Sequence, residues 1–345
     1  IIRRVPGIFT LSEFNFAQDA RISIRGNGIR SPFGIRGIKI LTDDISESTP
    51  DGQAQLDNID LNYFNNMNVY RGSASPLFGN ASGGAINFIS IMPSRKNTMN
   101  YKFMVDSHRS NAMNYFINRT YKFIDWNFSM TRQNFIGYRN HSSMLSNIFN
   151  SKIILKFKKL GFFSIHLNHL DTPYAFDPGS LNKNQKYQNP FSAGEKNVLY
   201  DSKESVVQTK ISISNYKKLK SNIISKQNIW FVDRYFKNKL PFYDGGQVKL
   251  NRYYMGINSK YIYSFNSDNF DYNLLLGFEL SNQKDERKRY DNIYGTRGIL
   301  TYNALESFLN YGTFAQLKIL MDKIIVFSSL RYDNSKINFN NFENK

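Results

Sequence analysis

The side chains that most often carry out chemistry in proteins are sparse in this sequence. The chain has no cysteine, which excludes disulfide scaffolds, thiol nucleophiles and thiolate metal sites. Its four histidines are His108, His141, His166 and His169. His166 and His169, the closest pair, are three residues apart, which places them on opposite faces of a strand and does not make a metal-binding pair.

Two further patterns resemble catalytic or phosphate-binding motifs only weakly. Residues 26–31 form a GxGxxG-like pattern with Ser31 in the last place, but neither a helix-opening context nor a P-loop lysine follows. Asp57 and Asp60 form no evident acid–base pair, and the chain has no nucleophile elbow. The sequence therefore predicts a protein that is not an enzyme and that uses no cofactor or metal.

The charge of the chain is strongly positive and unevenly distributed. The formal net charge is +18, and residues 1–92 hold 8 basic and 8 acidic side chains, so the whole excess lies in residues 93–345. The lysines there occur singly or in short groups, whereas nucleic-acid-binding proteins gather them on one face. We therefore expect them on solvated turns and loops and predict no nucleic-acid partner; a soluble basic protein that binds RNA or DNA is the alternative.

Glycine is concentrated in the first 92 residues, which hold 10 of the 21 glycines. These glycines separate short β-type runs, and because glycine permits positive φ and close backbone approach, we predict a compact α+β unit. The runs are Arg21–Arg25, Ile38–Thr42, Met67–Tyr70 and Ala85–Ile89. The first two runs are expected to pair as a hairpin, which would place their outer flanks, residues 13–20 and 45–55, at one end of the unit.

From about residue 99 on, apolar and polar residues alternate. Residues 272–280 place five apolar side chains on one face and mainly polar ones on the other, the period of an amphipathic strand. No apolar run approaches the ~18 residues of a membrane helix. About eleven strands are predicted, near residues 99–107, 113–119, 121–134, 147–157, 162–170, 205–214, 222–236, 250–265, 270–282, 304–320 and 324–333.

The connections between these strands alternate in length. Short turns are predicted at 158–161, 215–221, 266–269 and 321–323, and long polar links at 135–146, 171–204, 237–249 and 283–303. Long links at one end of a sheet are typical of a transmembrane β-barrel, whose strands turn apolar side chains to lipid and whose sheet must close. A soluble β-solenoid or sandwich is the alternative.

Six ordered segments resemble the plug domain of TonB-dependent outer-membrane transporters: residues 21–26, 34–43, 49–53, 58–61, 68–72 and 77–84. The motif residues in them are Gly26, Arg36, Gly37, Asp43, Gly52, Gly72, Gly79, Gly83 and Gly84. Asp44 stands where the family usually has glycine, and aspartate is among the residues that adopt the left-handed conformation.

The resemblance implies a mainly β fold in which an α+β plug lies inside a partial antiparallel transmembrane β-barrel, with about 11 of an expected 22 strands. Residues 1–92 would be the C-terminal part of the plug domain, without the TonB box, and residues 99–345 the N-terminal half of the barrel. The chain opens without a signal peptide, so we expect it to be a fragment.

The second region is similar to the enterobacterial branch of this family that imports pyrroloquinoline quinone. The similar segments are residues 137–142, 177–181, 245–248, 254–257 and 330–332. This implies TonB-dependent active uptake of a scarce nutrient across the outer membrane of a Gram-negative bacterium, with pyrroloquinoline quinone or a similar small anionic cofactor as the ligand. The alternatives are a ferric-siderophore receptor and, in another class, a passive porin or adhesin-type barrel.

The family also implies partners and site residues. The partners are TonB, with ExbB and ExbD, on the periplasmic side, outer-membrane lipid and lipopolysaccharide, and a small-molecule ligand. Arg25 and Arg71 would lock the plug to barrel glutamates beyond residue 345. The residues expected to face the ligand at the plug apices are Asn15, Gln18, Asp19, Thr49, Asp51 and Gln53. An anionic ligand would also need cations, for which Lys203, Arg234, Arg252 and Lys260 are candidates.

Overall fold

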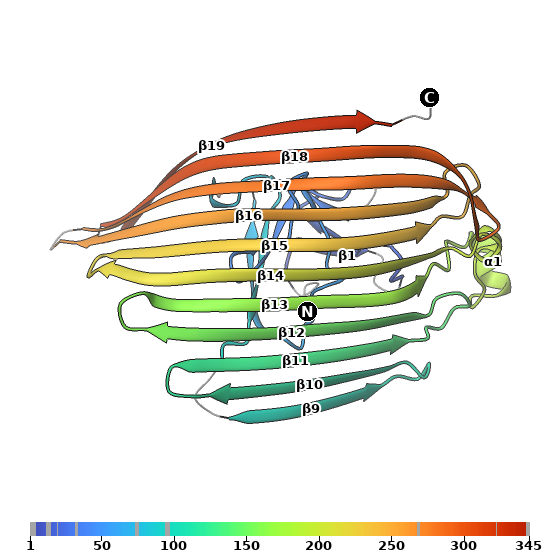
Figure 1. Ribbon diagram of the computed structural model, residues 1–345, viewed down its shortest axis with the longest axis horizontal. Helices are drawn as coiled ribbons and strands as arrows, with labels where there is room; N and C mark the ends of the chain where they lie inside the picture. The colour runs from blue at the N-terminus through green and yellow to red at the C-terminus, as the bar shows by residue number, and fades with distance from the viewer. Residues whose placement is uncertain are drawn as a thin grey trace.

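The chain folds into an N-terminal unit of short strands and one large sheet, and is mainly β (Figure 1). The computed structural model describes residues 5–11, 15–18, 20–31, 34–72, 76–93, 97–267, 270–321 and 323–342. Among these residues, no helix is long and apolar enough to cross a membrane.

The large sheet contains eleven antiparallel strands in sequence order, the number that the alternating pattern predicts. They are β9 (Thr98–Val105), β10 (Asn111–Thr120), β11 (Ile124–Phe135), β12 (Met144–Phe157), β13 (Gly161–Phe176), β14 (Lys203–Lys220), β15 (Ile223–Lys239), β16 (Gln247–Asn266), β17 (Asp271–Ile293), β18 (Thr296–Met321) and β19 (Ile324–Asn341). Each strand pairs with the next one along the chain, so the whole sheet is a meander.

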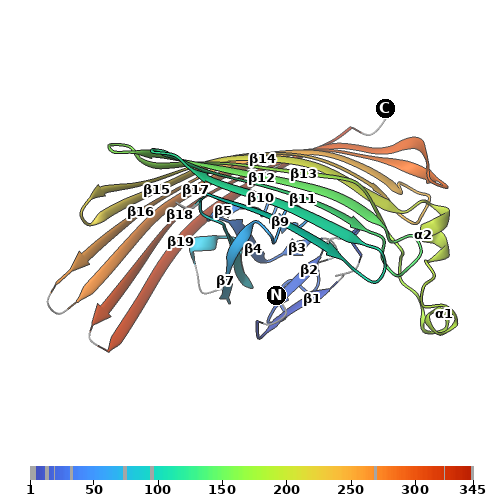
Figure 2. The ribbon, with the colours of Figure 1, turned by 90° about the horizontal axis from the view of Figure 1, so that it is seen from below.

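The sheet is curved, and the N-terminal unit lies against its concave side (Figure 2). Side chains alternate along each strand: in β15, Trp230 and Arg234 are buried, whereas Ile229 and Phe231 are 54% and 45% exposed. The concave face is rich in buried polar groups, and the convex face exposes large apolar side chains. A soluble sandwich would stack its apolar faces on each other, so this arrangement fits a wall that faces lipid.

The links between strands differ at the two ends of the sheet. At one end, the short-turn end, the strands are joined by residues 121–123, 158–160, 221–222, 267–270 and 322–323. At the other, the long-link end, they are joined by residues 106–110, 136–143, 177–202, 240–246 and 294–295. The link 177–202 contains the helices α1 (Lys183–Gln188) and α2 (Glu195–Leu199).

One predicted long link is wrong. Residues 283–303 are not a polar loop but the ends of β17 and β18, joined by a two-residue turn at Tyr294 and Gly295. The extended strands carry charge on both faces: Arg287 and Glu306 form an ion pair on one face, with Nε and Oε1 2.9 Å apart, and Glu286 and Lys288 lie on the other. A strand with no apolar face loses the period-two hydrophobic pattern, so its sequence resembles a loop.

The N-terminal unit is built on a mixed four-stranded sheet of order β5-β4-β8-β7, in which β4 and β8 are parallel. Isoleucines from several strands form its core, among them Ile22, Ile38 and Ile86. In the described part of the unit the only helical element is a 3-10 turn, so the predicted α content is not found among these residues. The elements are β1 (Ile8–Leu11), β2 (Arg21–Ile24), β3 (Ile35–Arg36), β4 (Ile38–Thr42), β5 (Ile45–Ser46), β6 (Gln53–Ala54), β7 (Phe64–Arg71), η2 (Pro76–Phe78) and β8 (Gly84–Ser90).

The predicted hairpin between the first two runs is also wrong. β2 pairs with β1, and both edges of β4 are taken by β5 and β8. The turn after β4 behaves as expected, however: Asp43 and Asp44 have φ of 51° and 66°, the left-handed values that a two-residue turn requires at both positions. At Gly84, with φ of 131°, a Cβ would lie 2.1 Å from the Tyr70 carbonyl oxygen, so only glycine fits.

Candidate functional site

The interface between the N-terminal unit and the sheet contains four buried cations. Lys152, Lys210, Arg234 and Arg252 lie on β12, β14, β15 and β16, at the alternate positions that face the unit. Their side chains are 2–5% exposed. Unpaired charges are very costly at such burial, so each cation needs a partner.

All four cations find carboxylates of the N-terminal unit. Lys210 bonds Glu47, whose side chain is 3% exposed. The other three contacts join Lys152 Nζ to Asp43 Oδ2 at 3.0 Å, Arg234 Nη2 to Asp57 Oδ2 at 2.6 Å, and Arg252 Nη2 to Asp51 Oδ2 at 3.7 Å. The acidic groups of the unit are therefore matched to the basic groups of the sheet.

Arg252 also belongs to a network within the sheet. Its Nε and Nη2 donate to the two carboxylate oxygens of Asp285 at 2.9 and 2.6 Å, a bidentate arrangement. Gln283 donates to Asp285 Oδ2 at 3.0 Å and accepts the backbone N–H of Asp51 at 3.2 Å. These bonds within the sheet hold the guanidinium in place beside Asp51.

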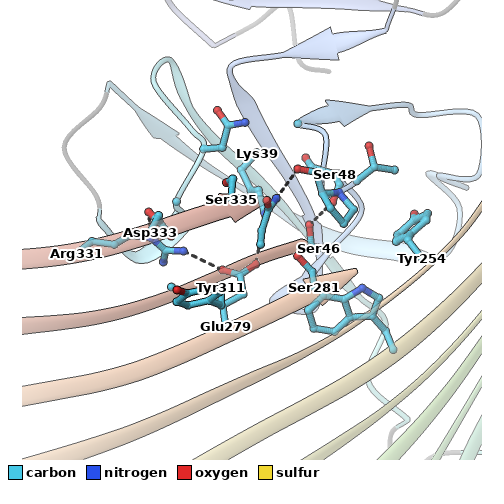
Figure 3. Close-up of a pocket in the computed structure, with 18 residues that line it drawn as sticks. Lys39, Ser46, Ser48, Tyr254, Glu279, Ser281, Tyr311, Arg331, Asp333 and Ser335 are labelled. Atoms are coloured by element: carbon cyan, nitrogen blue, oxygen red, sulfur yellow. Dashed lines mark hydrogen bonds and ion pairs between the residues drawn. The ribbon is translucent and has the colours of Figure 1, made fainter. Parts of the chain in front are cut away.

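Closer to the edge strand β19, the charges are exchanged: the unit supplies the cation and the sheet supplies the carboxylate (Figure 3). Lys39 of the unit donates to Glu279 Oε1 at 3.4 Å, and Arg331 approaches Glu279 Oε2 at 3.3 Å. These groups line a cavity of about 250 Å³ between the unit and strands β15–β19, together with Tyr254 and Ser335. Its charged groups already pair with one another across the interface.

Two acidic groups of the unit, Asp51 and Asp43, are held in their charged form. Burial alone would raise the pKa of Asp51, but the charge of Arg252 and the hydrogen bonds from Thr49 and Gln53 hold that pKa below its ordinary value of 3.8. Burial likewise works against ionised Asp43, and the Lys152 charge with the Ser90 hydroxyl and N–H lowers its pKa nonetheless. Both carboxylates therefore remain ionised at neutral pH.

Hydrogen bonds and a ring contact complete the interface at β11 and β13. The Tyr63 hydroxyl donates to Asn127 Oδ1 at 2.9 Å, and the Thr131 hydroxyl donates to Asp60 Oδ2 at 2.6 Å. His166 stacks on the Tyr63 ring with centroids 5.4 Å apart. Small apolar clusters around Ile45 and Ala17 also cross the interface, beside these hydrogen bonds and the ion pairs.

The first predicted apex reaches the long-link end. Asn15 Nδ2 and Gln18 Nε2 donate to the two carboxylate oxygens of Asp177 at 2.7 and 3.2 Å, just after β13. Asp19 lies outside the described residues. Arg139 fixes the same link by donating to the carbonyl oxygens of Pro178, Gly179 and Ser192.

The second predicted apex is tied down by its own contacts. The Thr49 hydroxyl lies in hydrogen-bonding contact with Asp51 and with the Gln53 carbonyl oxygen. Arg36, a motif residue, donates to the Asp51 carbonyl oxygen at 2.8 Å. Because Asp51 meets Arg252 in the half of β16 next to the long links, both apices lie toward one end, as predicted, although the expected hairpin is absent.

Arg25 and Arg71 lie together on the exposed side of the unit. Arg71 Nη1 donates to the Pro6 carbonyl oxygen at 3.2 Å, and the Arg25 N–H donates to the Gly7 carbonyl oxygen at 2.8 Å. Within the described ranges neither arginine forms an ion pair. Their role as locks therefore stays a prediction.

Most of the cations proposed to bind an anionic ligand already form ion pairs with carboxylates of the chain. Arg234 and Arg252 bind carboxylates of the unit, and Lys203 Nζ lies 2.7 Å from Asp201 Oδ2. Lys260 faces the unit from β16 without such a partner in the part of the chain described. The expectation that the basic residues lie on solvated turns and loops is therefore wrong for these strand positions. Lysine or arginine on the polar face of a predicted strand was the sequence feature that could have revealed the buried cations.

Comparison with known proteins identifies the N-terminal unit. Residues 1–86 match the family described as TonB-dependent Receptor Plug Domain. The chain is similar in structure to the ferric citrate transporter FecA in its unliganded form, at 16% identity and a TM-score of 0.86, over 99% of this chain and 54% of that one.

Two further solved structures are similar. One is the siderophore receptor PiuA from Acinetobacter baumannii, at 12% identity and a TM-score of 0.69, over 90% of this chain and 53% of that one. The other is the ferric-catecholate import receptor Fiu from E. coli K12, at 12% identity and a TM-score of 0.74, over 99% and 57%. The chain spans about half the length of the structures it matches. Its N-terminal unit is a plug domain of the TonB-dependent receptor type, and the chain has the fold of about half of such a receptor.

Proposed function

We propose that this chain is part of a transporter that takes up a scarce small ligand across the outer membrane of a Gram-negative bacterium, driven by TonB with ExbB and ExbD. Residues 1–92 would form the plug and residues 99–345 part of the barrel wall, its convex face in contact with lipid and lipopolysaccharide. The observation that carries this proposal is the position of a plug domain on the polar concave face of an amphipathic sheet.

The nature of the interface supports active transport. Breaking ion pairs and hydrogen bonds costs little when water can replace them, whereas an apolar core would have to be exposed. The plug can therefore move off the sheet if an applied force lets water enter. A passive pore has no need for a plug with four matched ion pairs, which disfavours the porin alternative.

For the ligand we propose a small anion such as pyrroloquinoline quinone or a related cofactor. Two of the segments that carry this resemblance, residues 137–142 and 177–181, touch each other at the long-link end through Arg139. There they adjoin Asn15 and Gln18 of the first apex. This group of residues is where we place the first contact with the ligand.

A ferric siderophore is the second candidate. The similar solved structures are named for ferric citrate, siderophore and ferric-catecholate transport, which favours iron uptake by the same mechanism. The two candidates share the plug and the energy source and differ only in the ligand.

Uptake by living cells tests the proposal. A deletion strain complemented with the native gene should accumulate the ligand only when TonB is functional, and an otherwise identical strain without TonB serves as the control. Growth that depends on added quinone cofactor supports the first ligand, and iron-dependent growth independent of quinone supports the second. Uptake that is unchanged without TonB or proton motive force would exclude active transport.

A further inference from the structure

Two inward-facing lysines lie apart from the matched ion pairs. Lys226 on β15 and Lys260 on β16 are directly opposite each other in the antiparallel ladder. Both occupy the same alternate positions as Arg234 and Arg252, which face the plug. Like charges directly opposite in a sheet are destabilising. Neither lysine forms an ion pair within the residues that the structure describes.

A second lysine pair on the same two strands shows how such repulsion is relieved. Lys237 and Lys249 are also directly opposite, but on the outward face. Both ammonium groups lie over the ring of Tyr235, at 4.8 and 5.4 Å from its centroid. An aromatic face attracts cations and compensates the pair.

The inward pair has much weaker compensation. Lys226 Nζ is 6.0 Å from the centroid of the Tyr216 ring, and Lys260 has no ring contact among the described residues. The carboxylates of Asp44 and Glu279 attract Lys260 from a distance, but Asp44 is bonded to Asn87, and Glu279 to Lys39 and Arg331. Neither carboxylate forms an ion pair with the two lysines among the described residues, so an added anion has both ammonium groups to bind.

A large cavity adjoins this pair at the short-turn end. It measures about 510 Å³, lies between the plug and strands β11–β15, and is lined by Lys226, Asp44 and Asn228. Two buried atoms of its lining residues, Asp125 Oδ1 and His166 Nε2, have no hydrogen-bond partner. Such atoms are rare in folded proteins, and because Asp125 Oδ1 can only accept a hydrogen bond, they indicate that the cavity holds water.

A third unpartnered group lies next to the lysines. The Asn258 amide is two residues from Lys260 on the same face of β16, and its Oδ1 is buried without a partner. Asn258 and Asn228 are directly opposite each other, one step along the ladder from the lysine pair. The Nδ2 groups of the two amides and the two ammonium groups can donate to an anion, whereas Asn258 Oδ1 can only accept, for example from a water or a protonated phosphate oxygen.

We infer that Lys226 and Lys260, with Asn228 and Asn258, bind a multivalent oxyanion, a carboxylate or a phosphate, beside this cavity. An anion between the ammonium groups removes their repulsion and gains charge-assisted hydrogen bonds. The site lies toward the short-turn end, remote from Asn15 and Asp177. That it is the last contact of an acidic ligand before release rests on the proposed function; the binding of the anion does not.

Thermal unfolding of the purified native protein in detergent tests this site, with citrate and phosphate as separate probes and chloride keeping the ionic strength constant. The wild-type midpoint should rise and saturate with at least one probe, and the probe that saturates identifies the chemistry. The double variant Lys226→Met/Lys260→Met should need at least tenfold more anion for the same rise. The matched control Lys237→Met/Lys249→Met should respond like the wild type.

A charge reversal shows that loss of binding is not loss of folding. Lys260→Glu should pair with Lys226, raise the midpoint without anion and abolish the response to it. No saturating rise in the wild type, or the same saturation in all variants, would overturn the inference. If the anion response appears but TonB-dependent uptake does not, the site stands and only the transport proposal fails.

Discussion

Lys210 of β14 reaches across the interface to Glu47 of the plug, and their side chains are 2% and 3% exposed. Removing one partner leaves the other charge buried and unpaired, which costs about 3–5 kcal/mol. We therefore expect Lys210→Met and Glu47→Gln each to lower the free energy of unfolding in urea by about that amount. The double variant should lose much less than the sum of the two.

The outward-facing Lys249→Met is the control for the first prediction and should change the free energy of unfolding by less than about 1 kcal/mol. Protease cleavage of the plug gives a second readout, because a loosened plug is cut faster. Strictly additive losses in the double variant would show that the two residues act independently.

Acid should weaken the interface through Asp51. Because its pKa is lowered on folding from 3.8, Asp51 contributes stability that is fully present above pH 3.8 and is lost as the pH falls through the lower folded value. The unfolding midpoint, measured from pH 7 down to about pH 2.5, should fall more steeply in the wild type than in Asp51→Asn below that point. Equal slopes in the two proteins would contradict the assigned role.

Gly256 should not accept a side chain. It lies opposite Trp230, and a Cβ there would be 2.3 Å from Cζ2 of the indole ring. Gly256→Val should displace the ring from its cluster with Ile45 of the plug and cost about 1–3 kcal/mol. Fluorescence of Trp230, measured with Trp126 replaced by Phe, should report a wetter indole.

The control for that substitution is Met255→Val on the exposed face of the same strand, which should leave the fluorescence unchanged. An unshifted emission spectrum in Gly256→Val would mean that the ring has room to move without leaving the plug.

Asp177 should couple the link 177–202 to the plug. Asp177→Ala removes the acceptors of Asn15, Gln18 and the Gly179 N–H, whereas Asp177→Asn keeps one oxygen. Hydrogen exchange across residues 177–202 should be fastest in the alanine variant and intermediate in the asparagine variant. Global stability should change by only about 0.5–1.5 kcal/mol, since these contacts are partly solvated. Unchanged exchange in both variants would show that Arg139 alone fixes the link.

The amphipathic strands could be predicted because each has one polar and one apolar face, so polar and apolar residues alternate along its sequence. Their number, the polar concave side and the positive φ of Asp44 followed from that pattern and from local backbone preference. The plug segments were found from short ordered motifs, which depend on turns and not on distant contacts.

The pairing of charges across the interface could not be predicted in the same way. Glu47 and Lys210 are 163 residues apart. The strand pattern around Lys210 can show that this lysine faces inward, but nothing local shows which carboxylate it meets. The misplaced hairpin has a similar origin: the partner of β4 is β8, more than forty residues further on, and the strength of parallel pairing is not visible in either run alone. Residues 283–303 were wrongly predicted to be a loop because the ends of β17 and β18 have no apolar face, so their sequence is as polar as that of a loop.

The length of β17 and β18 has a practical consequence. With 26 residues at ~3.4 Å each, β18 is about 88 Å long, far more than the ~25 Å apolar band of a membrane barrel even when tilted by ~40°. If the long-link end faces the outside of the cell, the turn at Tyr294 and Gly295 lies well outside the lipid. It is the tip of a two-stranded extension in which Arg287 pairs with Glu306. An epitope inserted at that turn would be displayed on intact cells without disturbing the apolar, lipid-facing band of the strands.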